Sequence, residues 1–87
     1  PAARLVLPEG VDGAELVRTA EAVALARDLV NTPANDMGPA EIEAAIRALA
    51  EETGAVVTAI VGDDLLARNF PMIHAVGRAS PRLPRLI

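Results

Sequence analysis

The polar connection bounded by two prolines in the first half of this chain constrains the fold more than any other feature. Pro33 disfavours helical backbone angles at the residue before it, so a helix that leads into the connection ends near Asn31. Pro39 suits the first position of a helix, where its missing N–H is not needed, and Gly38 directly precedes it. The sequence therefore predicts two helices joined by a tight polar turn.

The first helix has a capping signal and an apolar stripe. Asp12 stands three residues before Glu15, the spacing at which each side chain can bind a backbone N–H in the first turn. Apolar residues then recur at helical spacing: Leu16, Ala20, Val23 and Val30. We expect a helix from about residue 12 to residue 31, roughly 30 Å long. That length suits a helix that links two domains.

The second predicted helix begins at Pro39, and Gly54 is placed to end it in a left-handed conformation. Its apolar residues again follow helical spacing: Ile42, Ala45, Ile46 and Leu49. Its charged residues point the other way, and we interpret them as a solvated face: Glu41, Glu43, Arg47, Glu51 and Glu52.

The remaining apolar segments predict strands. Arg4–Leu7 reads as a strand or an extended lead-in, and Arg85–Ile87 as a strand. Ala55–Val61 is β-branched with little alternation, which is typical of a parallel strand covered on both faces. Short helices are expected at Asp63–Ala67, with Asp63 as the cap, and at Met72–Val76. A strand–helix–strand crossover predicts parallel neighbours, so we expect an α/β fold with parallel strands.

Composition narrows the possible functions. The net charge of -4 and the pI of about 4.8 argue against a nucleic-acid partner, because phosphate binding needs a cationic face. All eight basic residues are arginine and there is no cysteine, which excludes lysine and thiol chemistry within the chain. No apolar run reaches the roughly 20 residues that span a bilayer, so we expect no membrane partner. The chain runs from Pro1 to an apolar Ile87, and we expect it to be a piece of a longer protein.

Four polar positions could carry chemistry, and each has a plain structural interpretation that we favour. Asp63 and Asp64 could bind a metal after a strand, but helix capping explains them without further ligands. His74 has apolar neighbours, and we expect it to be partly buried and bonded to a backbone carbonyl. Ser80 lacks the glycine spacing of a nucleophile elbow, so it is interpreted as loop polarity. The acids that follow Gly62 would repel phosphate.

Two asparagines flank the first proline of the polar connection. Asparagines in turns commonly bond their own backbone, which is the role we favour for Asn31 and Asn35. The alternative is that they pin the start of a catalytic domain against a neighbouring loop.

From Glu21 to its end, the chain resembles the leucyl aminopeptidase (cytosol aminopeptidase) family. The segments that carry the resemblance occur in the family's order: Glu21–Asn35, Gly38–Ala40, Met72–Gly77, Ser80 and Pro84–Ile87. The resemblance implies a partial three-layer α/β/α domain with parallel strands, preceded by a long linking helix. Residues 1–31 would be the end of an N-terminal region with the linking helix, and residues 32–87 the first part of the catalytic domain.

The resemblance also implies a cytoplasmic exopeptidase that is hexameric and removes N-terminal amino acids from peptides. In that family two divalent metal ions (Mn or Zn) activate the attacking water. A lysine and several carboxylates hold the ions, and no position here matches those motifs. We therefore expect no catalytic, cofactor-binding or metal-binding residue in this chain, and no activity from the chain alone.

Two other interpretations stay open. The chain could be a non-enzymatic α/β interaction module that assembles through the exposed edges of strands Val56–Val61 and Arg85–Ile87, because unpaired edges invite pairing. A nucleotide-binding α/β piece is a weaker alternative.

Overall fold

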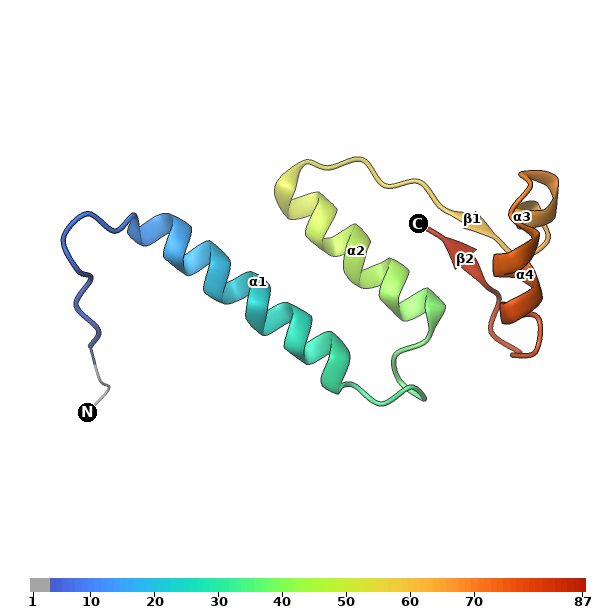
Figure 1. The fold of residues 1–87 in the computed structure, drawn as a ribbon, viewed down its shortest axis with the longest axis horizontal. Helices are drawn as coiled ribbons and strands as arrows, with labels where there is room; N and C mark the ends of the chain where they lie inside the picture. The colour runs from blue at the N-terminus through green and yellow to red at the C-terminus, as the bar shows by residue number, and fades with distance from the viewer. Residues whose placement is uncertain (1–3) are drawn as a thin grey trace. The chain divides into compact units, whose positions relative to one another are not determined.

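A computed structural model of the protein describes residues 4–87 and divides the chain into two compact units. The first unit ends at Asn31, and the second runs from Thr32 to Ile87. The order of the elements along the chain can be followed in Figure 1. We describe each unit by itself.

The first unit is built on one helix, α1 (Gly13–Asn31), which confirms the helix predicted from about residue 12 to residue 31. Asp12 caps it as expected, because its Oδ1 accepts hydrogen bonds from the backbone N–H of Ala14 at 2.9 Å and of Glu15 at 3.3 Å. Arg4–Leu7 forms no strand. This segment is an exposed stretch before α1, and no strand of the described residues pairs with it.

The second unit begins with the connecting loop (residues 32–38) and α2 (Pro39–Thr53). The predicted start and end of this helix are both confirmed. Gly38 donates its backbone N–H to the Glu41 carboxylate at 3.0 Å, which satisfies a donor that the helix itself leaves free. Gly54 closes the helix at φ 73°, and its N–H binds the Ala50 carbonyl.

A two-stranded sheet follows α2, and its strands are short. β1 (Ile60–Val61) pairs with β2 (Arg85–Leu86), with Ile60 opposite Leu86 and Val61 opposite Arg85. The strand predicted over Ala55–Val61 therefore forms only at its last two residues. Val56 is 92% exposed, because the described part of the chain supplies no partner strand beside that segment.

The sheet also corrects the prediction of parallel neighbours, because β1 and β2 run antiparallel. The chain leaves β1 through Gly62 and returns through Pro84, and the N–H of Gly62 binds the carbonyl of Pro84 at 2.8 Å. The connection between them contains α3 (Asp64–Ala67) and α4 (Pro71–Gly77). These two short helices pack on each other and on the strands, so they turn the chain back at the same end of the sheet (Figure 1).

The core of the second unit is small. Among the described residues, Leu65 of α3 is fully buried and Ala50 of α2 is 8% exposed, and no other apolar side chain reaches that level except Pro84. The architecture is mostly helical with one small sheet, which fits a partial α/β domain. None of the helices in residues 4–87 has the length and apolar character needed to cross a bilayer.

At Gly77, α4 lies close to Pro84 in the segment before β2. A Cβ at this position would lie 2.7 Å from the Cγ of Pro84 and 3.2 Å from its Cα. Pro84 is itself buried and has backbone atoms in the contact, so it has little room to move.

We expect Gly77→Ala to lower the free energy of unfolding by about 1–3 kcal/mol through overpacking, although alanine is the better helix former. Urea unfolding followed by circular dichroism measures this change. Val76→Ala is the control on the same helix, because the Val76 side chain is 79% exposed. A Gly77→Ala protein as stable as the parent would show that the helix and Pro84 are not in close contact.

Candidate functional site

Arg82 connects distant segments of the second unit through its guanidinium group. Its Nη1 donates to the carbonyl oxygen of Ala34 at 3.0 Å, and its Nη2 donates to the carbonyl oxygen of Asn35. The same guanidinium lies 3.9 Å from Oε2 of Glu41. One side chain from the segment before β2 thus holds the connecting loop and the first turn of α2.

A second arginine joins α2 to the sheet. Arg85 of β2 donates from Nη1 to Oε2 of Glu43 at 2.5 Å, and Arg47 binds the other oxygen of Glu43 at 2.7 Å. The Glu43 and Arg85 side chains are only 13% and 16% exposed. Nε of Arg85 is buried with no acceptor in the described part of the chain. Glu43 is therefore a largely buried anion shared by Arg85, which is also largely buried, and by Arg47, whose side chain is 48% exposed.

This cluster shifts the titration of Glu43. The hydrogen bonds from Arg47 and then Arg85 favour the ionised form, and they lower the pKa of Glu43 below its ordinary value of 4.5 despite the opposing effect of desolvation. The cluster corrects the expectation for Glu43, which was interpreted as part of a solvated helix face and is only 13% exposed, whereas Arg47 is 48% exposed as that interpretation expects. Periodicity places a residue on a face, but it cannot show that an arginine 42 positions away returns to that face.

Of the two acids after β1, Asp64 lies in the first turn of α3 as predicted, whereas Asp63 does not make the predicted capping bond. Asp63 occupies the cap position of α3, but its side chain makes no capping hydrogen bond. Its Oδ1 instead lies 3.1 Å from Nε2 of His74. His74 was expected to bind a backbone carbonyl, and its partner is this carboxylate. Its side chain is 19% exposed, which agrees with the expected partial burial.

The other candidates have structural roles. Ser80 accepts a hydrogen bond at its Oγ from the backbone N–H of Arg82 at 3.1 Å, and so shapes the loop before β2. In the connecting loop, the carbonyl of Pro33 accepts hydrogen bonds from the N–H groups of Asp36 at 2.8 Å and Met37 at 2.9 Å. Asn35 takes part through its backbone carbonyl and not through the expected side-chain turn.

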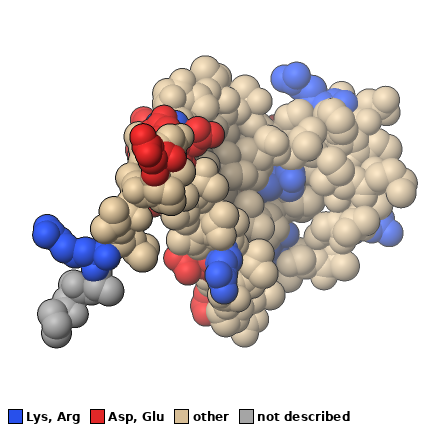
Figure 2. All heavy atoms as spheres, turned by 60° about the vertical axis from the view of Figure 1, so that its left-hand side comes forward, with Lys and Arg blue, Asp and Glu red and all other residues tan. Residues whose placement is uncertain are grey.

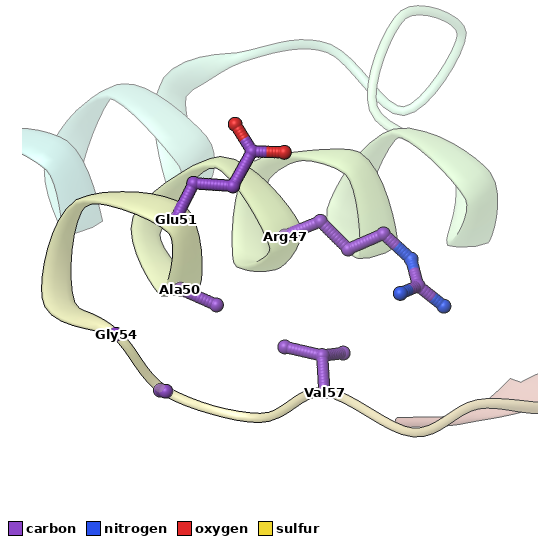
Figure 3. Close-up of a pocket in the computed structure, with 6 residues that line it drawn as sticks. Arg47, Ala50, Glu51, Gly54 and Val57 are labelled. Carbon is purple, nitrogen blue, oxygen red and sulfur yellow. The ribbon is translucent and has the colours of Figure 1, made fainter.

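A hollow on α2 offers no comparable chemistry. It is lined by the last turns of the helix and by the segment after Gly54, with a volume of about 360 Å³. The side chains of Ala50 and Val57 point toward each other across it, whereas the carboxylate of Glu51 points away (Figure 3). On the face drawn in Figure 2, several acidic side chains gather at one place, and basic side chains are scattered among uncharged surface.

The residues described here do not fit a two-metal centre. Within residues 4–87 there is no group of three or more histidine, cysteine, aspartate or glutamate side chains that could hold a metal ion. The Asp63–His74 pair supplies two groups whose facing atoms already bind each other. A dinuclear site needs several carboxylates or imidazoles around each ion, so we assign no metal ligand here.

Comparison with known proteins identifies the class. The catalytic-domain model of the cytosol aminopeptidase family matches residues 24–87. A protein named probable cytosol aminopeptidase from Nocardia farcinica (strain IFM 10152) is 43% identical over 79 residues, which cover 91% of this chain and 15% of that protein. The chain belongs to the cytosol aminopeptidase family.

Two further relatives carry the same name. The protein from Rhodococcus erythropolis (strain PR4 / NBRC 100887) is 43% identical over 68 residues, and the one from Corynebacterium diphtheriae (strain ATCC 700971 / NCTC 13129 / Biotype gravis) is 44% identical over 68 residues. Each match covers 78% of this chain and 14% of the relative. The chain thus spans about one seventh of the length of these relatives. No solved structure matches it significantly.

Sequence reasoning missed Arg82 and Arg85 as organising residues. Arg82 stands between Pro81 and Pro84, and Arg85 directly follows Pro84, so this short segment gives no periodic signal. The one available hint was that every basic residue of the chain is arginine and none is lysine. Only arginine can present two parallel N–H donors to neighbouring acceptors.

The lowered pKa of Glu43 makes the stability of the second unit depend on pH. Its ionised form is favoured by folding, so its contribution is complete above the ordinary value of 4.5 and is lost as pH falls through the lowered pKa. We expect Glu43→Gln to be less stable than the parent at pH 6.5, and the difference to shrink as the pH approaches 3. Urea unfolding at several pH values measures it. Glu52→Gln on the same helix controls for the loss of one negative charge.

Proposed function

We propose that these residues are a scaffold segment of a two-metal exopeptidase similar to leucyl aminopeptidase, an enzyme that removes N-terminal amino acids from peptides. The observation that carries the proposal is the match of residues 24–87 to the catalytic domain of that family. Residues 1–31 would form the end of an N-terminal region and the linking helix. Residues 32–87 would open a three-layer α/β/α catalytic domain.

The exposed apolar surface of the second unit supports a scaffold role. Pro39 of α2, Met72, Ile73 and Val76 of α4, and Pro84 before β2 line a groove of about 490 Å³. Met72 is 75% exposed and Val76 is 79% exposed. Apolar surface of this kind is costly in water and is typical of a face that packs against other protein. The rest of the catalytic domain is the partner we propose.

The metal chemistry would lie outside this chain. Two divalent ions, Mn or Zn, supply an activated water to such enzymes when bound. The side chains described here would support the domain that holds them: Arg82 binds the connecting loop, and Arg85 of the sheet binds Glu43 of α2. By the same resemblance we propose peptide substrates, a hexameric assembly and a cytoplasmic location.

A grafting experiment tests this function. The 87-residue chain alone is expected not to hydrolyse leucine p-nitroanilide with added Mn²⁺ or Zn²⁺. The Nocardia farcinica relative with its matched 79 residues replaced by those of this chain is expected to hydrolyse it. Val76→Glu in the graft should reduce activity, since it places a charge in the groove, and Glu52→Gln is the matched surface control. Metal-dependent turnover by the isolated chain would contradict the proposal.

The interaction module remains the second candidate, because β1 and β2 form a sheet of only two strands and each has an outer edge without a partner in the described residues. Sedimentation velocity distinguishes the two functions. Concentration-dependent assembly of the isolated chain that is lost on replacing Leu86 with proline favours the module. A monomer at all concentrations counts against it.

A further inference from the structure

The connecting loop is held by a side chain that lies far away in the sequence. Arg82 stands 48 positions after Ala34 and 47 after Asn35, and its two terminal nitrogens bind their two carbonyl oxygens. The loop's own hydrogen bonds, from Asp36 and Met37 to the Pro33 carbonyl, use a different acceptor. Arg82 therefore adds a restraint that the local turn does not supply.

Gly38 provides the space that this arrangement needs. Its backbone, at φ -97° and ψ -172°, is an extended conformation that any residue adopts, so glycine is not required there for backbone freedom. A Cβ at Gly38 would lie 2.8 Å from Cδ of Arg82 and 2.9 Å from Oε2 of Glu41, and closer still to Nη1 of Arg82. Because Gly38 has no side chain, the Arg82 guanidinium has room to reach the loop.

Glu41 is the third residue of this arrangement, beside Arg82 and Gly38. Its Oε2 accepts the N–H of Gly38 at 3.0 Å and lies 3.9 Å from Nη1 of Arg82. Its own backbone N–H, the N–H of Gly38 and the charge of Arg82 lower the pKa of Glu41, although desolvation opposes them. The anion therefore faces the arginine in its charged form at neutral pH.

We propose that Arg82, seated over Gly38 and facing Glu41, is a positioning residue that fixes the conformation of the connecting loop where the chain passes from the first unit to the second. The planar fork of arginine suits two adjacent carbonyls, and lysine, with one compact ammonium, cannot bind both in the same way. The inference concerns the loop alone and does not depend on the aminopeptidase activity.

Amide hydrogen exchange of the 87-residue chain, followed by NMR, tests the proposal. In Arg82→Ala the amides of Asp36 and Met37 are expected to exchange about tenfold faster or more, because hydrogen bonds from a charged donor that fix the loop are lost. The amides of α4 are expected to keep their rates. Arg78→Ala is the charge-matched control, since Arg78 is an exposed arginine at the end of α4. Arg82→Lys should restore only part of the protection.

A second variant, Gly38→Ala, tests the same contact while Arg82 is still present. Gly38→Ala leaves the backbone conformation accessible but displaces the guanidinium, so it should accelerate the same two amides. The double variant should show less acceleration than the sum of the two single variants, because both changes displace the Arg82 guanidinium. Unchanged exchange in Arg82→Ala, equal acceleration throughout the second unit, or additive effects in the double variant would each overturn the proposal.

Discussion

Two arginines from one short segment hold the second unit together. Arg82 binds the loop before α2, and Arg85 binds Glu43 in the second turn of that helix. The apolar stripe of α2 does not make this attachment: Ile42 and Leu49 remain 42% and 44% exposed. Charged hydrogen bonds are directional, so they set where the helix lies even where little apolar surface is buried.

This reliance on polar contacts follows from the composition. Alanine supplies much of the apolar fraction of the chain, and Phe70 is its one aromatic residue. Small side chains bury little area, so each contributes little hydrophobic stabilisation. Among the described residues the apolar core is correspondingly thin, with Leu65 at its centre. In the function we propose, the exposed groove of α4 would be covered by the remainder of the catalytic domain, and the arginine contacts would place α2 for that packing.

Local signals predicted the helices well, and they did so for physical reasons. Pro33 and Pro39 restrict backbone angles regardless of their surroundings, and Gly54 can adopt the left-handed angles that end a helix. The observed end of α1 and both ends of α2 follow these residues. The strands were predicted less well. A β-branched run such as Val56–Val61 becomes a strand only where a neighbour binds its backbone, and the sequence alone does not show where that neighbour ends. The parallel pairing was wrong because α3 and α4 turn the chain back instead of carrying it across the sheet.

The sequence by itself determined where helices begin and end, the exclusion of lysine and thiol chemistry, and the family to which the chain belongs. Those properties depend on the identity of neighbouring residues and on their order. Only the tertiary structure decided that Glu43 is shared by two arginines, that Asp63 faces His74, and that Gly38 makes room for Arg82. Each of these depends on groups far apart in the chain meeting within a few ångströms, and no local preference specifies such a meeting.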